Sequence, residues 1–191
     1  MRITLLNQKG GVGKTTISLL LAGALQRAGY NVAIDDRDPQ KSATFFANQF
    51  GLPMIEDNPK AETIITDTPG HLRIEGAIER ELVELIKESD KLLLVTKKDS
   101  ISIHGTAPMA RLIKKYKRKR AKAYILFNEV QTTTTIGKQS GKEIAADLGL
   151  PALRNELRLA SAYKNALLRG LSAITSRHRP ELVNLALEIM K

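Results

Sequence analysis

The sequence predicts an α/β fold in which a mostly parallel, doubly wound sheet carries helices on both faces. Short apolar runs typical of strands alternate along the chain with longer segments whose apolar residues recur at helical spacing. Such alternation favours a parallel sheet that is covered on both sides. With 191 residues, 42% of them hydrophobic, the chain is long enough for one core. We therefore expect a single domain over residues 1–191, without an N-terminal DNA-binding extension.

The first third of the chain alternates strands and helices from its first residue. A strand at 1–6 is followed by a glycine-rich turn. A helix is expected from Thr15, because apolar residues then recur every three or four positions, at Ile17, Leu20, Leu21, Ala24, Leu25 and Ala28. A strand at 31–35, a helix at 41–50 and a strand at 63–67 come next. Asp35 is anomalous because a charge buried in a strand is costly, and the simplest explanation is that this strand ends early.

The rest of the chain continues the alternation. The pattern predicts helices at 74–87, 103–117 and 136–148, and strands at 91–96 and 123–128. An extended segment at 152–157 then precedes two final helices, near 160–169 and 180–190. Ligands of open parallel sheets bind at the carboxyl ends of the strands, so we expect the functional residues at that edge.

Composition excludes several classes of site. The sequence has no cysteine, so there is no disulfide framework and no thiol catalysis. Its three histidines, His71, His104 and His178, are scattered and lack the spacing of a zinc site. No signal peptide and no apolar run of membrane-spanning length is present, which predicts a cytoplasmic protein.

The positive charge of the chain is concentrated in one short run. The formal net charge is +10, from 30 Lys and Arg against 20 Asp and Glu. Residues 111–122 contain no acid and eight of these bases: Arg111, Lys114, Lys115, Lys117, Arg118, Lys119, Arg120 and Lys122. Without them 22 basic residues would face 20 acidic ones, so the chain is a nearly neutral domain with one basic patch.

The turn after the first strand has the pattern of a phosphate-binding loop. It reads NQKGGVGKTT over residues 7–16, between a strand and a helix. In such a loop the backbone N–H groups and the helix N-terminus face an anion, a lysine (Lys14) reaches the outer phosphates, and a hydroxyl (Thr15) binds Mg²⁺. A dinucleotide-binding turn would need a glycine at position 16, where this chain has Thr16. We therefore expect a nucleotide triphosphate to be bound by Lys9, Gly10, Gly11, Val12, Gly13, Lys14, Thr15 and Thr16.

One departure from the general pattern points to a family. The first glycine expected at position 8 is replaced by Gln8, and Lys9 precedes the glycines. This "deviant" P-loop resembles that of the ParA/MinD family of ATPases. The resemblance implies that Lys9 crosses to a partner subunit and contacts its phosphates, so that ATP is held between two monomers. A solvated lysine, or a second contact to the chain's own phosphates, is the alternative.

Acidic residues at the ends of the second and third strands extend the resemblance. The segment DDRDPQ resembles the family's second motif, which implies that Asp38 orients the hydrolytic water and that Asp36 lies near the Mg²⁺ shell. The segment IITDTPG resembles the Walker B segment, with Asp67 holding a magnesium-bound water. Each Asp has the alternative role of a helix or turn cap. Gly70 stands where many relatives have a proline.

The likeness covers nearly the whole chain and implies a function. Asn128 falls where relatives use an asparagine near the adenine, although an Asn after a strand is also common in turns. The late segment matches in Arg158, Ala166 and Gly170. The chain looks like a compact plasmid-type partition ATPase: an ATP- and Mg²⁺-dependent homodimer that binds DNA, with slow hydrolysis through Lys9, Lys14 and Asp38. A ParB-like or cargo-adaptor protein would accelerate the hydrolysis, and ATP-bound protein would associate with the nucleoid.

Alternatives to this function differ in what is bound. Positioning of another cargo, such as carboxysomes, uses the same chemistry, and so does MinD-like membrane association through a last helix. The acidic residues of that helix make lipid binding unfavourable, so we expect no membrane partner. An iron-protein-like reductase would need cysteines, and a non-enzymatic ATP-binding scaffold stays open.

The basic run at 111–122 is the predicted DNA surface. It is expected on the solvent side of a helix, and with Tyr116 as its only aromatic residue it favours contacts to phosphates over base stacking. A solvated basic face is the plain alternative. A rival DNA surface is formed by the late basic residues Arg154, Lys164, Arg169, Arg177 and Arg179.

Overall fold

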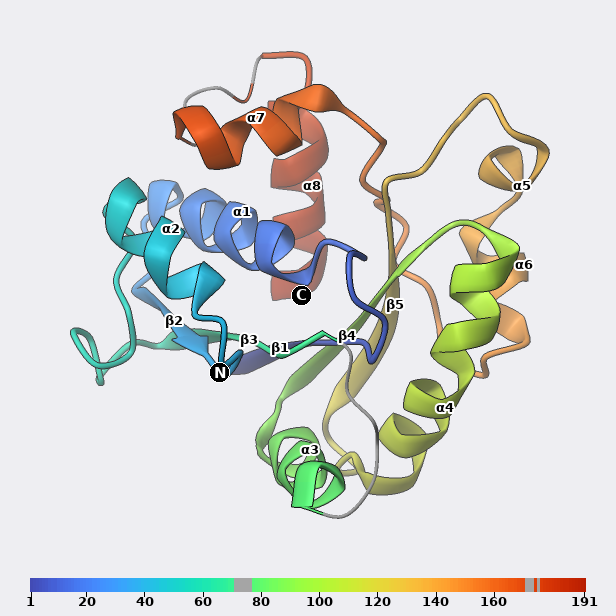
Figure 1. Cartoon of the computed structure of the whole chain (residues 1–191), viewed down its shortest axis with the longest axis horizontal. Coiled ribbons are helices and arrows are strands. Elements are labelled where there is room, and N and C mark those ends of the chain that lie inside the picture. The colour runs from blue at the N-terminus through green and yellow to red at the C-terminus, as the bar shows by residue number, and fades with distance from the viewer. Residues whose placement is uncertain (71–76, 171–173, 175) are drawn as a thin grey trace.

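The computed structural model describes residues 1–70, 77–170, 174 and 176–191. Its centre is a five-stranded parallel sheet in the order β2-β3-β1-β4-β5 (Figure 1). The strands are β1 (Arg2–Leu6), β2 (Val32–Asp36), β3 (Thr63–Asp67), β4 (Lys91–Lys97) and β5 (Lys122–Asn128). All neighbouring strands pair in parallel, so their carboxyl ends share one edge of the sheet.

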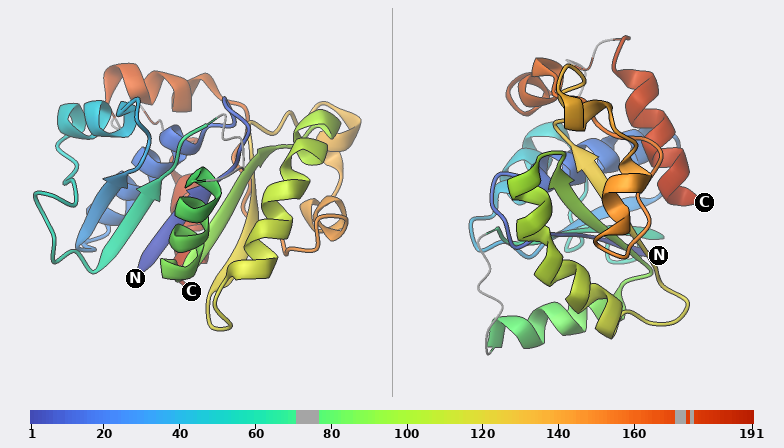
Figure 2. Two further views of the ribbon diagram at one scale, coloured as in Figure 1. Left: turned by 60° about the horizontal axis from the view of Figure 1, so that its bottom comes forward. Right: turned by 90° about the vertical axis from the view of Figure 1, so that its right-hand side faces the viewer.

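Helices cover both faces of the sheet, as the sequence predicted (Figure 2). The helices are α1 (Lys14–Arg27), α2 (Ser42–Phe50), α3 (Ala77–Glu88), α4 (Ser100–Tyr116), α5 (Thr135–Lys138), α6 (Gly141–Ala146), α7 (Ser161–Arg169) and α8 (Arg179–Met190). One face packs against α1, α2, α7 and α8, and the other against α3, α4 and α6. The strand and helix bounds agree with the predicted ones to within a few residues; of the predicted helix at 74–87, residues 74–76 lie outside the described part.

Two hydrophobic clusters, one on each face, form the core. In β1, Ile3 and Leu5 point into the cluster under α1, and Leu6 points into the cluster under α4. This alternation follows from the two-residue period of a strand. The two clusters hold β1 at the centre of the sheet, and the turn that follows β1 is therefore anchored on a strand whose last four residues are buried.

The predicted helix at 136–148 is wrong in its continuity. The structure has two short helices, α5 and α6, separated by extended backbone at Gln139 and Ser140. The buried ammonium of Lys98 donates to the carbonyl oxygens of Gly137 (3.4 Å) and Gln139 (2.7 Å) and to Glu156 (2.9 Å). A buried Lys must find acceptors, and these carbonyls would otherwise accept helical hydrogen bonds.

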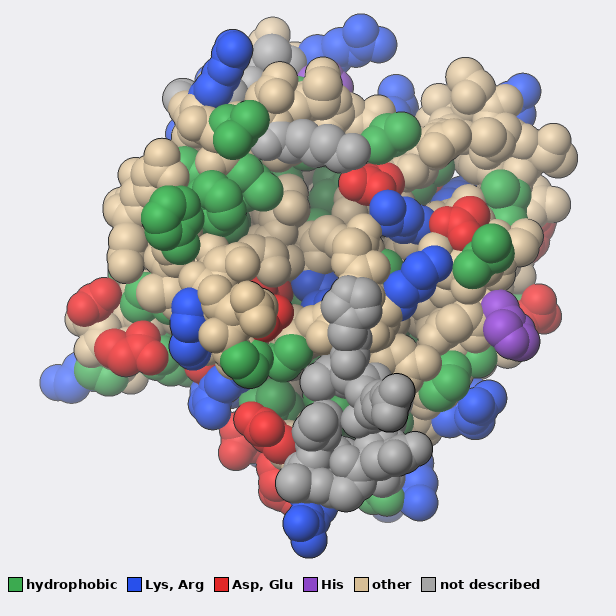
Figure 3. Space-filling model, viewed as in Figure 1, with side chains coloured by type: hydrophobic (Ala, Val, Ile, Leu, Met, Phe, Trp, Pro, Cys, Tyr) green, Lys and Arg blue, Asp and Glu red, His purple; other side chains and the backbone are tan. Residues whose placement is uncertain are grey.

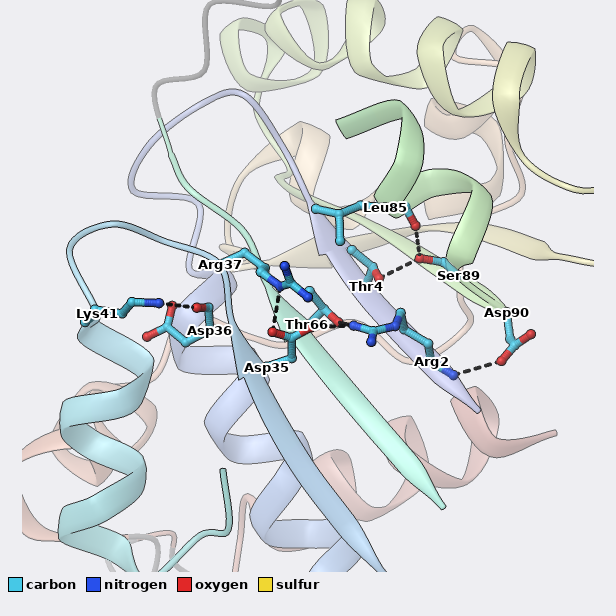
Figure 4. Close-up of polar contacts among 10 residues, drawn as sticks. All are labelled: Arg2, Thr4, Asp35, Asp36, Arg37, Lys41, Thr66, Leu85, Ser89 and Asp90. Atoms are coloured by element: carbon cyan, nitrogen blue, oxygen red, sulfur yellow. Dashed lines mark hydrogen bonds and ion pairs between the residues drawn. The ribbon is translucent and has the colours of Figure 1, made fainter. Parts of the chain in front are cut away.

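The expectation that β2 ends before Asp35 is also wrong. β2 runs through Asp36, and Asp35 pairs in register with Thr66 of β3. Its carboxylate accepts from the guanidinium of Arg2 and from Arg37 Nε (2.7 Å), and Arg2 also donates to Thr66 (Figure 4). The buried charge is thus paired on both oxygens, which is how a strand accommodates a carboxylate.

The last helix covers the core and supports the segment before it. Leu182, Leu185, Ala186 and Ile189 of α8 are buried, as the sequence predicted. Its two acids accept from backbone N–H groups: Glu188 from Arg154 (2.7 Å), and Glu181 from Arg158 (2.7 Å). The predicted extended segment at 152–157 is confirmed, because it runs beside β5 with isolated bridges at Ala152 and Arg158.

On the face of Figure 1, hydrophobic side chains gather over α2 (Figure 3). Phe45 is 66% exposed there and meets Phe46 edge to face. Of the helices that the structure describes, none is both long and apolar enough to span a bilayer.

Candidate functional site

The glycine-rich turn joins β1 to α1 at the carboxyl edge of the sheet. β1 lies between β3 and β4: the chain places β2 and β3 on one side of β1, and β4 and β5 on the other. The carboxyl end of β1 is therefore a topological switch point of the sheet. Gly11 (φ +71°) and Gly13 (φ +92°) adopt the left-handed backbone that favours glycine. A Cβ at Gly13 would lie 2.2 Å from Asn128 Nδ2, so only glycine fits.

Lys14, the first residue of α1, points back into this turn. Its side chain is buried, and its ammonium donates to the carbonyl oxygen of Asn7 (3.1 Å). Burial lowers the pKa of Lys14, although the charges of Asp67 and Asp38 act in the opposite direction. A buried ammonium with a weak acceptor is well suited to bind an anion that enters the turn.

Asp67, the last residue of β3, lies directly below the start of α1. It is fully buried and accepts from Thr15 Oγ1 (2.7 Å) and Ser18 Oγ (3.1 Å). Burial raises the pKa of Asp67 from 3.8 to about 6, against the opposing effects of Thr15, Lys14 and Ser18. Its negative charge is therefore incompletely compensated, which favours a cation at this place.

Asp36 and Asp38 lie in the turn after β2 and have different surroundings. Both oxygens of the buried Asp36 accept hydrogen bonds: Oδ2 from the N–H (2.8 Å) and hydroxyl (2.9 Å) of Thr44, and Oδ1 from the N–H of Asp38 (3.0 Å). Asp36 thus organises the turn that carries Asp38. Asp38 is half-buried, accepts from the N–H of Gln40 (2.9 Å), and its charge acts on Lys14.

Lys9 lies outside the glycine turn and points toward α4. Its ammonium donates to Ser102 Oγ (2.9 Å), and its backbone N–H donates to Asn7 Oδ1 (2.9 Å). The two lysines of the loop are therefore divided: Lys14 lies inside the anion-binding turn and Lys9 beside it. Whether Lys9 contacts the phosphates of its own chain or of a partner stays a prediction.

Two further residues hold the turn in shape. Asn128, at the end of β5, donates from Nδ2 to the carbonyl oxygen of Val12 (2.8 Å). This contact braces the loop, and the role of Asn128 near a base stays a prediction. Gly70 approaches from the other side, since a Cβ there would lie 3.0 Å from Gly10 Cα and 3.7 Å from Lys14 Nζ.

These residues fit a nucleoside triphosphate with Mg²⁺. Among the described residues no side chain caps the first turn of α1, so its N–H groups face the glycine turn. Lys14 would reach the phosphates, and Thr15 and Asp67 supply the hard oxygen ligands that Mg²⁺ prefers. The described chain holds no group of three or more His, Cys, Asp or Glu that would form a metal centre by itself. Mg²⁺ commonly binds through one or two carboxylates together with phosphates.

The basic run lies far from this site, at the opposite edge of the sheet. α4 ends at Tyr116 and β5 begins at Lys122, so the run covers the last turns of α4, the connection at 117–121 and the first residue of β5, at the amino ends of the strands. The expectation that Lys117 and Arg118 lie on a helix is wrong, because Lys117 ends the helix and donates to Ala121 O (3.2 Å). Arg118 donates to Asp90 Oδ1 (2.9 Å) and to the carbonyl oxygens of Glu88 and Ser89 at the end of α3. The exposed members are Arg111, Lys114, Lys115, Lys119, Arg120 and Lys122.

A second basic surface lies at the carboxyl edge. A groove of about 890 Å³ runs between the loop after β5, the extended segment and the start of α8. Its lining includes the exposed Arg154, Arg158 and Arg177. The two acids of its lining are engaged elsewhere, Glu156 with Lys98 and Glu181 with Arg158 N–H and Tyr163. The groove, called the arginine groove below, therefore has an excess of positive charge.

Sequence reasoning missed three residues that support the site. Asn7 is fully buried and joins β1 to β4 and α4 through Val95 O (2.7 Å) and Thr106 (3.1 Å). Ser18 and Thr44 fix the carboxylates of Asp67 and Asp36. Ser18 lies four residues after Lys14 on α1, a spacing that shares a helix face and that was a signal available in the sequence.

Comparison with known proteins finds relatives among nucleotide-binding domains and ATPases. The family model described as "CobQ/CobB/MinD/ParA nucleotide binding domain" matches residues 3–173. The chain is 26% identical over 191 residues to maintenance of carboxysome distribution protein A from Gloeobacter kilaueensis, covering 92% of this chain and 84% of that protein. It is 58% identical over 43 residues to the chromosome-partitioning ATPase Soj from Thermus thermophilus, covering 22% of this chain and 17% of Soj.

For some relatives the match covers only a small part of the protein. The match to an uncharacterized protein of Methanocaldococcus jannaschii covers 33% of that protein. Among solved structures, the cell division protein MinD from Aquifex aeolicus superposes with a TM-score of 0.75 at 16% identity. The superposition covers 99% of this chain and 96% of that one. At that identity the likeness concerns the fold.

Proposed function

Because this chain belongs to the CobQ/CobB/MinD/ParA family of nucleotide-binding domains, we propose that it is an ATPase that positions a cargo by alternating between a monomer and an ATP-bound dimer. The observation that carries this proposal is the division of labour between two lysines of one loop. Lys14 is buried inside the turn opposite Asp67, whereas Lys9 is half-buried and its ammonium points out of the turn to Ser102. One lysine suffices for the phosphates of the same chain, so the second serves a partner.

In this mechanism each residue has one task. The N–H groups of the turn and the Lys14 ammonium bind the phosphates, and Thr15 and Asp67 hold Mg²⁺. Mg²⁺, when bound, supplies positive charge that offsets the charge of the phosphates. Asp36 fixes the turn of Asp38, and Asp38 orients the attacking water. Lys9 contacts the phosphates of the partner chain.

Slow turnover by the protein alone is part of the proposal. Arg37 is adjacent to Asp38, but its Nε donates to Asp35 on the opposite face of the sheet (Figure 4). Arginine residues that accelerate phosphoryl transfer must contact the phosphates, and Arg37 is held away from them. A partner protein, of the ParB-like or cargo-adaptor kind, is therefore proposed to stimulate hydrolysis.

Hydrolysis is tested with Asp38→Ala. We expect the variant to keep ATP affinity but to lose phosphate release at least about tenfold, because water positioning is lost while Lys14 and Asp67 are intact. Asp57→Ala, which removes an exposed carboxylate, is the matched control. Phosphate release by Asp38→Ala at the rate of the unmodified chain would assign the role to another residue. An unmodified chain that forms ATP dimers without releasing phosphate would be the non-enzymatic scaffold.

The cargo is proposed to be plasmid or chromosomal DNA or another large body, such as a carboxysome, with DNA as the matrix. Cytoplasmic protein would associate with the nucleoid when ATP is bound. A MinD-like membrane role is disfavoured, because the apolar face of α8 is buried in the core and Glu181 and Glu188 bind backbone N–H groups. A lipid-binding helix would keep its apolar face free.

Two surfaces are proposed to contact DNA phosphates, with different dependence on ATP. Joining two copies at the carboxyl edge would leave both basic runs at the outer ends of the dimer. The arginine groove lies at the carboxyl edge, where dimer formation brings two grooves close to one duplex. We assign the ATP-dependent part of DNA binding to the groove, and a weaker, ATP-independent part to the run.

Two triple variants with equal charge loss separate these surfaces. Replacing Arg154, Arg158 and Arg177 by Ala should flatten the slope of log affinity against log salt for ATP-bound protein by up to about 5, because the dimer loses six arginines and each phosphate contact contributes about 0.9. Replacing Arg111, Lys114 and Lys115 by Ala should weaken binding equally with and without ATP. The reverse result, with ATP-dependent binding lost only in the second variant, would return the assignment to the run.

A further inference from the structure

The ammonium of Lys9 occupies an acceptor site built by the start of α4. Ser102 Oγ accepts from Lys9 Nζ (2.9 Å) and donates to Asp99 Oδ2 (2.7 Å). The other oxygen of Asp99 accepts from the N–H of Ser102 (2.8 Å), as the N-cap of the helix. The hydroxyl is buried and fixed by the carboxylate, so its free lone pair is directed at the lysine.

The charges around this acceptor site match a cation. Burial alone would raise the pKa of Asp99, yet the hydrogen bonds from Ser102 and the charges of Lys9 and Lys97 hold it below its ordinary value. Asp99 is therefore ionised at neutral pH, and its negative charge lies directly behind the hydroxyl that Lys9 contacts. Such a charge-assisted hydrogen bond is stronger than a neutral one.

The neighbouring residues of the loop are tied to the same helix. Gln8 Nε2 donates to Gly105 O (3.0 Å), and Asn7 Nδ2 donates to Thr106 Oγ1 (3.1 Å). The first two contacts fix the path of the loop, and only the Lys9 contact involves a long flexible side chain. Lys9 is thus the member of this set that is able to leave without unfolding the loop.

We propose that Asp99 and Ser102 form a cis latch that holds Lys9 within its own chain, and that Lys9 must leave this latch before it contacts a partner chain. The proposal rests on the proposed function, since it concerns the lysine that joins two copies. One ammonium does not satisfy Ser102 and a phosphate of the partner at the same time. The latch therefore keeps the free chain monomeric and sets the ATP concentration at which dimers form.

The size of the effect follows from population arithmetic. A chain whose binding-competent conformer is only a fraction of the population has an apparent affinity reduced by that fraction. Because Lys9 is half-buried, water offsets part of the charge-assisted strength, and a net hydrogen bond of ordinary strength corresponds to roughly a three- to tenfold bias toward the latched conformer. Weakening the latch should therefore lower the ATP midpoint of dimer formation by about the same factor.

The contact itself is tested on the nucleotide-free chain by acylation of lysine amines, read by mass spectrometry with the exposed Lys60 as internal reference. Lys9 should react more slowly than Lys60, and several-fold faster after Ser102→Ala. Asp99→Asn, which keeps the oxygen that caps α4 but removes the charge, should act in the same direction. Ser100→Ala, an exposed serine of the same helix turn, is the matched control and should change nothing. An unchanged Lys9 rate in both latch variants would overturn the proposal.

The consequence is tested by light scattering during an ATP titration. Ser102→Ala and Asp99→Asn should form dimers at a roughly three- to tenfold lower ATP concentration than the unmodified chain, while Ser100→Ala matches it. An unchanged or higher midpoint would overturn the latch. If the unmodified chain forms no ATP dimer, the proposed function fails, and the acylation result still decides whether Asp99 and Ser102 hold Lys9.

Discussion

Asp35 and Asp67 are two buried carboxylates on neighbouring strands, and they are treated in opposite ways. They lie on opposite faces of the sheet, because Asp35 pairs in register with Thr66 and Asp67 with Asp36. Asp35 contacts an arginine through each oxygen, from Arg2 and from Arg37. The carboxylate of Asp67 accepts hydrogen bonds from the hydroxyls of Thr15 and Ser18, and its pKa is raised to about 6.

The difference separates a structural charge from a functional one. Both oxygens of Asp35 are paired with arginines, so this group holds β1, β2 and β3 together. In the part of the chain that the structure describes, no basic side chain forms an ion pair with Asp67, although Lys14 acts on it from a distance. Incompletely compensated charge in a pre-formed turn is a feature of ligand sites, because the ligand supplies the missing charge.

The largest effect is expected when the positive partner is removed from the functional region. Lys14→Ala should weaken ATP binding by at least about 100-fold, because charge-assisted hydrogen bonds to phosphate are lost. Calorimetric titration with Mg·ATP measures this. Lys60→Ala removes an exposed lysine of the same type and should leave affinity unchanged. A Lys14→Ala chain that binds ATP normally would show that the turn does not use this ammonium.

Removing the carboxylate of Asp35 should lower the stability of the nucleotide-free chain. Asp35→Ala leaves the partly buried Arg2 without its carboxylate partner, and we expect the free energy of unfolding to fall by about 2–4 kcal/mol. Urea denaturation of the nucleotide-free chain measures it. The exposed Asp57 gives the control, since Asp57→Ala should change stability by less than about 0.5 kcal/mol. A loss as small as the control's would mean that the Asp35 group is not structural.

Replacing Asp67 should have the opposite effect on the free energy of unfolding to replacing Asp35. Asp67→Asn removes an uncompensated buried charge and should raise the free energy of unfolding of the nucleotide-free chain by about 1–2 kcal/mol, while Mg²⁺-dependent ATP binding falls. The folded pKa of about 6 lies above the ordinary 3.8, so ionised Asp67 destabilises the fold increasingly as the pH rises through this interval.

The gain from Asp67→Asn should accordingly be larger at about pH 7.5 than at about pH 4.5, where the carboxyl of the folded chain is protonated. Thermal melts at the two pH values compare the variant with the unmodified chain. A variant less stable than the unmodified chain at both pH values would place Asp67 with Asp35 as a structural charge.

Features of the fold were predictable from the sequence where they depend on residues that are close together in the chain. The phosphate turn was predictable, because Gly13, Lys14 and Thr15 follow a local pattern between a strand and a helix. The pairing of Asp35 was not predictable, since its partner Arg2 is 33 residues away in the chain. The two residues meet because β3 alone separates their strands, β2 and β1, in the sheet. The break between α5 and α6 was hidden for the same reason, because Lys98, which binds the carbonyl oxygen of Gly137 there, is 39 residues away.

The site shows the same limit. Asp36, Asp38 and Asp67 were identified by resemblance, but nothing in the sequence indicates that both oxygens of Asp36 are bound by Thr44 and Asp38. The basic run was visible as composition, whereas its location at the amino edge of the sheet emerged only from the fold.

The central claim is that Lys9 serves a partner chain and Lys14 its own. Light scattering of the Lys9→Ala variant with saturating Mg·ATP tests it most directly, alongside the unmodified chain and Lys60→Ala. The account predicts that all three bind ATP, that the unmodified chain and Lys60→Ala become dimers, and that Lys9→Ala stays a monomer. A Lys9→Ala chain that forms dimers at the same ATP concentration as the unmodified chain would contradict it.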